Sequence, residues 1–146
     1  MPIYWIIILL IGISANFMQT EASRSEHLAM TSEVSAIARN ILIYRNALSE
    51  YAHANPGLTG SVNDTALLLP TWFTHLSGVN GYVVTGTSYT FYASPPNGLV
   101  TELAALTENS AAVGYASSGL LVSPSGGLTG IPLPTVIPTG AVVAYH

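Results

Sequence analysis

Residues 30–51 read MTSEVSAIARNILIYRNALSEY, and this stretch decides the fold. Apolar side chains recur in it at alternating spacings of four and three residues: Met30, Val34, Ile37, Ile41, Tyr44, Leu48 and Tyr51. A mean period of about 3.5 residues places all of them on one side of an α-helix. The sequence therefore predicts a long amphipathic helix with one continuous apolar stripe.

The stripe has two interpretations. It packs on a sheet of its own domain, or it pairs with a helix from another chain at coiled-coil positions, which would make the protein a homo-oligomer. Ala38, Leu42 and Ala47 widen the apolar face beyond a narrow seam. This width favours packing on a sheet, and the intermolecular seam stays open as the alternative.

The limits of this helix also follow from local signals. Ser23-Arg24-Ser25-Glu26 matches a capping box, in which a serine side chain and a glutamate side chain satisfy free N–H groups at a helix start. Asn55-Pro56-Gly57 combines a breaker with flexible residues and marks the end. We expect the amphipathic helix in residues 21–57.

The segment before it is apolar. Residues 3–18 read IYWIIILLIGISANFM and carry no charge, and such a helix would span about 24 to 27 Å. Residues 1–20 are therefore predicted to be a membrane anchor, with its most apolar part at Ile3, Tyr4, Trp5, Ile6, Ile7, Ile8, Leu9, Leu10 and Ile11. A cleaved secretory signal and a buried core helix are the alternatives for this segment.

Residues 58–146 change in character to Gly, Ser, Thr, Pro and β-branched residues, which is typical of short strands joined by turns. Residues 82–85 and 88–93 flank Gly86 and predict a hairpin. Further strands are expected at 111–115, 120–122 and 141–145, a helical turn at 64–69, and a second helix from Leu99 towards Asn109.

Two details of this region bear on packing. Trp72 and Phe73 form an aromatic pair that we expect to be buried against the long helix. Pro132, Pro134 and Pro138 restrict their segment to a sheet edge or an extended loop. The predicted fold class is α+β, with the membrane helix leading into a long helix that packs on a small, mostly antiparallel sheet.

The composition excludes several functions. Three arginines, no lysine and a net charge of −4 disfavour nucleic-acid binding. The chain has no cysteine, which excludes a thiolate metal site and a cysteine nucleophile. His75 and Asp64 could be imagined in a triad with a serine, but no nucleophile elbow or other catalytic motif occurs. We predict no enzyme activity, no cofactor and no metal site.

An uncharged anchor, an amphipathic helix and a small Gly/Thr/Ser/Tyr-rich domain resemble the layout of type IV pilins and pseudopilins. The hydrophobic stretch lacks the glutamate and the leader of a prepilin, so prepilin processing is not expected. The chain is most similar to the PilM family of thin-pilus systems on conjugative plasmids. The anchor, the run ARNILIYRN at 38–46 and LPTWF at 69–73 carry this resemblance.

The resemblance implies an inner-membrane component of the pilin transport apparatus and pilus basal body. It would cross the membrane once and place its C-terminal domain in the periplasm. We expect it to act through contacts of the helix stripe or a sheet edge with pilins or other assembly proteins. A minor pilin within the fibre and a small secreted adhesin-like module are the alternative functions.

Overall fold

The computed structural model describes the backbone of residues 3–146 and the side chains from residue 23 onward. The chain forms two compact units, residues 1–33 and 34–146. Helix α1 (Ile3–Ala54) runs through both of them without a break. It does not restart at Ser23, so the predicted cap there was wrong. No glycine or proline lies between residues 13 and 54 to interrupt the helix.

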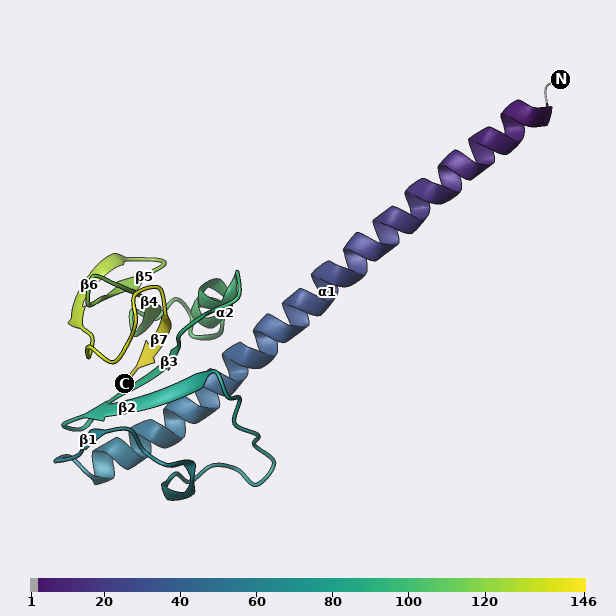
Figure 1. The fold of residues 1–146 in the computed structure, drawn as a ribbon. Coiled ribbons are helices and arrows are strands. Elements are labelled where there is room, and N and C mark those ends of the chain that lie inside the picture. The colour runs from purple at the N-terminus through teal and green to yellow at the C-terminus, as the bar shows by residue number, and fades with distance from the viewer. Residues whose placement is uncertain (1–2) are drawn as a thin grey trace. The chain divides into compact units, whose positions relative to one another are not determined.

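The second unit contains a seven-stranded antiparallel sheet in the order β1-β2-β3-β7-β4-β5-β6 (Figure 1). Its strands are β1 (Thr59–Gly60), β2 (Val79–Val84), β3 (Thr87–Tyr92), β4 (Val113–Ser117), β5 (Leu120–Ser123), β6 (Gly127–Pro132) and β7 (Val142–Tyr145). The short 3₁₀ helix η1 (Asp64–Ala66) follows β1, and helix α2 (Leu99–Leu106) connects β3 to β4. The C-terminal strand β7 lies at the centre of the sheet.

The sheet has a hydrophobic cluster on each face. On one face, residues from the second half of α1 and from α2 pack against Val79, Val83 and Val142. On the other face, Leu133, Ile137 and Ala141 from the loop before β7 pack against Phe91 and other sheet residues. The sheet is therefore covered by helices on one side and by a loop on the other.

These observations confirm the predicted α+β class and the antiparallel sheet. The hairpin is formed by β2 and β3 around Thr85-Gly86, and α2 begins at the predicted Leu99. The sequence did not predict β1, which has two residues, or β6 as a strand. β6 ends at Pro132 and lies at the sheet edge, where the prolines had placed this segment.

The prediction that Trp72 and Phe73 are both buried was half wrong. Phe73 packs partly against the α1 cluster, whereas Trp72 is 71% exposed. The Phe73 N–H donates to the carbonyl of Pro70 at 2.9 Å, which closes a turn. Neighbouring side chains diverge in such a turn, so only one of the two reaches the core.

The apolar N-terminal segment belongs to α1. Its backbone is helical, but the predicted anchor side chains lie outside the residues whose side chains are described. Across the described part of the chain, no helix combines the length and the apolarity needed to cross a membrane. The fold therefore gives no support of its own to the predicted membrane helix.

Candidate interaction site

The most distinctive feature of the second unit is the incomplete pairing along β2. β1 pairs only with the end of this strand, Thr59 with Val84 and Gly60 with Val83. Gly60 has a φ of 143°, a conformation that favours glycine, and the chain leaves the sheet after it. Within the described residues, the first half of β2 consequently has no strand beside it on this side.

The hydrogen-bond pattern shows which backbone groups are left open. In an antiparallel strand, alternate residues direct their N–H and C=O groups to opposite neighbours. The Thr85 N–H donates to Leu58 on the β1 side at 2.9 Å, so Val83, Gly81 and Val79 face the same side. The Val79 N–H donates to Leu76, and its carbonyl accepts from His75 Nε2 at 2.8 Å.

Gly81 is different from these neighbours. Among the described residues, no hydrogen bond reaches its N–H or C=O group from the β1 side. Its side-chain position is filled by α1, because a Cβ here would lie 2.7 Å from Tyr44 Cε1 and 2.8 Å from Leu48 Cδ2. Gly81 thus allows α1 to pack closely while its own backbone stays available.

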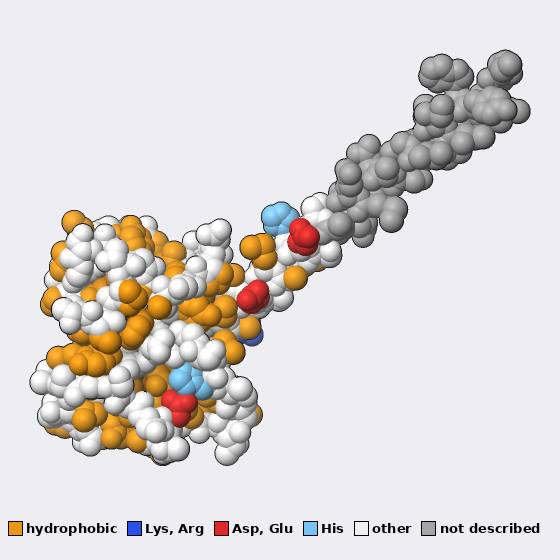
Figure 2. All heavy atoms as spheres, in the orientation of Figure 1, with side chains coloured by type: hydrophobic (Ala, Val, Ile, Leu, Met, Phe, Trp, Pro, Cys, Tyr) orange, Lys and Arg blue, Asp and Glu red, His pale blue; other side chains and the backbone are white. Residues whose placement is uncertain are grey.

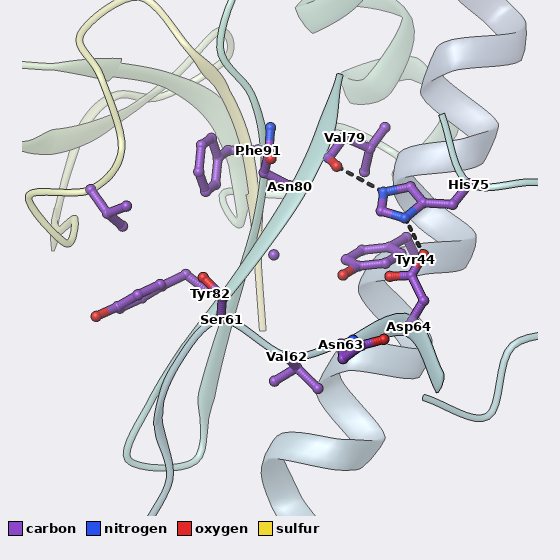
Figure 3. A pocket seen from close by; sticks show the side chains of 12 residues that line it. Tyr44, Ser61, Val62, Asn63, Asp64, His75, Val79, Asn80, Tyr82 and Phe91 are labelled. Atoms are coloured by element: carbon purple, nitrogen blue, oxygen red, sulfur yellow. Dashed lines mark hydrogen bonds and ion pairs between the residues drawn. The ribbon is translucent and has the colours of Figure 1, made fainter. Parts of the chain in front are cut away.

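A groove of about 450 Å³ lies beside this open backbone (Figure 3). Residues 61–64 line it where the chain departs from β1, and residues 79–82 line it along β2. Tyr44 and His75 lie on the α1 side, whereas Tyr82 and Phe91 reach it from the other face of the sheet. Val136 also lines the groove. The groove therefore runs along a strand edge and has both polar and apolar walls.

A polar cluster fixes the α1 side of the groove. Asp64 Oδ2 and His75 Nδ1 form a hydrogen-bonded ion pair, and the His75 ring stacks on Tyr44 with centroids 4.6 Å apart (Figure 3). The two nitrogens of His75 thus lie against Asp64 and the carbonyl of Val79. Burial, and then the charge and hydrogen bonding of Asp64, raises the pKa of Tyr44 to about 12.

The segment between η1 and β2 is fastened to α1 at a second place. Asn40 Nδ2 donates to the carbonyl of Thr74 at 2.8 Å, and the Leu76 N–H reaches Asn40 Oδ1 at 3.4 Å. Trp72 and Leu68 are nevertheless exposed on this segment. An exposed tryptophan on a fixed loop is a frequent anchor in protein interfaces. On the face drawn in Figure 2, few charged side chains interrupt the hydrophobic ones.

The residues of the predicted apolar stripe differ in burial. Ile37, Ile41, Tyr44 and Leu48 are buried in the core of the second unit. Val34 and Tyr51 are partly buried beside them, and Met30, which belongs to the first unit, is exposed. Most of the stripe is thus occupied by the domain's own sheet.

The opposite edge of the sheet, β6, is modified in ways that hinder strand pairing. Its pairing with β5 contains a register shift. Thr129 Oγ1 donates to the carbonyl of Leu121 and accepts from the Ile131 N–H at 3.2 Å, so this side chain bridges β6 to β5 at the register shift. Pro132, at the end of the strand, has no N–H group. Bulges and prolines of this kind protect natural sheet edges.

A second polar cluster joins the C-terminus to α1. Ser49 Oγ lies 2.7 Å from Nδ1 of His146, and the ring of His53 contacts that of His146 edge-on. Burial, Arg45 and His53 lower the pKa of His146. Arg45 Nε donates to the carbonyl of Tyr145 at 3.1 Å. These contacts hold β7 in the centre of the sheet.

A metal site needs several histidine or acidic side chains around one ion. In this part of the chain, no three histidine or acidic side chains are placed to hold one ion. His53 and His146 meet as a pair, while His75 is paired with Asp64. Both histidine clusters therefore have structural partners.

Comparisons with known proteins identify the family. The PilM family model matches residues 6–145. The chain belongs to the PilM family. A solved structure described as a PilM protein from Pseudomonas aeruginosa 2192 is 47% identical, covers 78% of this chain and 95% of its own, and has a TM-score of 0.52.

A second solved structure, described as PilM from Escherichia coli B7A, shares the fold with a TM-score of 0.61. It is 23% identical and covers 80% of this chain and 93% of its own. No curated protein gives a match. The resemblance seen in the sequence is thereby confirmed, and the chain is a pilus-related protein of the PilM family.

Sequence reasoning missed the open edge at Gly81. It suggested that a sheet edge contacts partners, but the relevant edge depends on where β1 ends. One local signal was present, because Asn80 and Gly81 interrupt an otherwise β-prone run between Val79 and Val84. A glycine within a strand often marks the close approach of another backbone or a ligand.

Proposed function

We propose that this PilM-family protein is an inner-membrane component of the pilin transport apparatus and thin-pilus basal body, which acts by binding other proteins. The observation that carries the proposal is the family match across nearly the whole chain. The uncharged residues 3–18 support a membrane anchor, and the second unit would then lie in the periplasm.

The second unit has the features of a binding module. Trp72 is exposed on a fastened segment, and the groove beside β2 offers unpaired backbone groups. The buried part of the stripe already packs on the sheet, which leaves these two surfaces as the better candidates for partner contact. Catalysis is not part of the proposal.

The test is a deletion of the gene, followed by complementation with the wild-type chain and with Trp72→Ala. We expect the deletion to reduce pilus number and conjugation in liquid. Trp72→Ala should complement poorly although the protein accumulates normally, because the exposed ring is not needed for folding. Leu128→Ala is a matched control, since it truncates another exposed apolar side chain that lies outside the groove. Normal piliation after deletion would contradict the proposal.

A second function is favoured by one observation, the unbroken α1 from Ile3 to Ala54, which is the layout of a pilin. In this alternative the protein is a minor pilin that enters the fibre. Mass spectrometry of sheared, purified pili distinguishes the two functions. The basal-body proposal predicts that the chain is absent from pili and present in the inner-membrane fraction.

A further inference from the structure

Gly81 combines two open backbone groups on one residue at the wall of a groove. We infer that this groove binds an extended segment of another protein, which adds to β2 as an antiparallel strand and pairs its backbone with Gly81. The segment would continue the line of β1 beyond Gly60. Every strand pair in the sheet is antiparallel, so the added strand follows the existing pattern.

The geometry of Gly81 fits a strand better than a small ligand. Because successive residues of β2 face opposite neighbours, the N–H and the C=O of Gly81 both point to the β1 side. This is the arrangement of a residue in a hydrogen-bonded antiparallel pair. One residue of an extended chain presents a complementary C=O and N–H at the same spacing. Peptide recognition by strand addition uses such edges for affinity and the neighbouring side-chain pockets for specificity.

A separate peptide segment fits this edge better than a second copy of the chain. Residues 61–64 line the groove opposite β2 in every copy. Two copies meeting edge to edge would each bring this segment between their β2 strands. A flexible tail or linker of a partner has no such wall and can enter the groove lengthwise.

The residues that line the groove indicate which side chains the bound segment carries. Because side chains alternate along a strand, the residue opposite Gly81 faces the α1 side, where Asp64 and Tyr44 lie. Asp64 is 39% exposed and is the single carboxylate among the residues that line the groove. His75 holds its Oδ2, and the exposed part of the carboxyl group favours a hydrogen-bond donor at the end of a long side chain, such as the ammonium group of lysine. The residues before and after the one opposite Gly81 face Tyr82 and Phe91, which favour apolar side chains.

The groove is held in shape before a partner arrives. Tyr44 and Leu48 support Gly81 from α1, and the Asp64–His75 pair ties residue 64 to the segment before β2. A preformed site loses little conformational freedom on binding, so a short segment can bind measurably. The occupant is therefore an extended, apolar-basic-apolar segment of a pilus-assembly partner.

This identification of the partner rests on the proposed function, whereas the binding chemistry of the groove does not. A test with a synthetic peptide and the purified protein, with its anchor in detergent, separates the two. Failure of peptide binding leaves the deletion phenotype unaffected. Normal piliation after deletion leaves peptide binding unaffected.

The probe is the peptide Thr-Val-Lys-Val-Thr with an acetylated N-terminus and an amidated C-terminus. Its binding to the protein is measured by NMR from the signal of the Gly81 amide. The matched control is the same peptide with an N-methyl group on the lysine amide, which removes the donor to the Gly81 carbonyl. We expect the loss of this hydrogen bond to weaken binding roughly 10-fold, because a factor of ten in affinity corresponds to about 1.4 kcal/mol. Ser61→Trp fills the groove and should abolish binding, while Ser125→Trp at an exposed turn should not.

The expected result is a shift of the Gly81 amide signal with the plain peptide and slower hydrogen exchange at that amide. Absence of binding, or equal binding of the plain and N-methylated peptides, would overturn the inference. Equal binding by Ser61→Trp and wild-type protein would place the peptide elsewhere and overturn it too. The peptide comparison uses wild-type protein, so it decides the question even if Ser61→Trp does not fold.

Discussion

The two edges of the sheet end in opposite ways. At β6, a register shift and a terminal proline hinder further pairing, and the Thr129 side chain bridges the strand to β5 at the shift. At β2, pairing with β1 stops after two residues, and the backbone of Gly81 stays open beside a groove. Natural sheets protect their edges because unpaired strands aggregate. An edge left open for one residue, within a groove, is therefore better explained as a recognition site than as a defect.

The two edges also differ in the side chains that pack against them. Tyr44 and Leu48 of α1 pack directly on β2 at Gly81, and the Asp64–His75 pair holds the facing wall. Leu128 on β6 is 73% exposed. The open edge is thus the one supported by packing from α1, which suits strand addition.

The largest expected effect on stability comes from removing a side chain of α1 that packs against β2. Leu48→Ala should lower the free energy of unfolding by about 2 to 5 kcal/mol, because it opens a cavity beneath β2. Leu128→Ala, the same truncation at the β6 edge, should change it by less than about 0.5 kcal/mol. Urea denaturation of both variants measures the difference. Similar losses in the two variants would contradict the assignment of a supported and an unsupported edge.

The second prediction concerns alkaline pH. Folding raises the pKa of Tyr44 from 10.0 to about 12, so the folded state holds this proton more tightly than the unfolded state. The resulting stability is fully present below pH 10 and is lost as the pH rises towards 12. Its size is on the order of 2 kcal/mol.

Tyr44→Phe should therefore lose less stability than the wild type between these pH values. Tyr115→Phe, at an exposed tyrosine, serves as the control and should follow the wild-type curve. Denaturant titrations at a series of pH values provide the measurement. Parallel curves for Tyr44→Phe and wild type would show that Tyr44 is not held as described.

The third prediction concerns the bridge between β6 and β5. Thr129→Val keeps the shape of the side chain but loses its bonds to Leu121 and Ile131, which should cost about 1 kcal/mol. The Ile131 N–H then loses its bridge to β5, and NMR should detect faster hydrogen exchange at this amide. Thr135→Val, an exposed threonine outside the sheet, should remain unchanged. Unchanged exchange at Ile131 in Thr129→Val would mean that this side chain does not hold β6 to β5.

The smallest effect is expected from Asp64→Asn. The pair with His75 is partly exposed to solvent, so its loss should cost less than about 1 kcal/mol. The pKa of Tyr44 should fall from about 12 but stay above its usual range, because burial is the largest cause of the shift. Carbon-13 NMR of the tyrosine rings measures this pKa. An unchanged pKa of Tyr44 would show that Asp64 does not interact with Tyr44 at the wall of the groove.

Local patterns predicted the hairpin and α2, because the spacing of apolar residues and the turn at Gly86 depend on near neighbours. The open edge could not be predicted in this way. It depends on Gly60 ending a strand that pairs with residues more than twenty positions away. Trp72 was misplaced because composition alone does not show which of two adjacent rings a turn directs inward.

The most direct test of the central claim is amide hydrogen exchange at β2 in the isolated protein. Tyr82 pairs with Tyr89 of β3, whereas the Gly81 N–H faces the groove. We predict that the Gly81 amide exchanges much faster than that of Tyr82 and becomes protected when the plain peptide is added. Equal protection of both amides without peptide would show that the edge is already covered and would contradict the account.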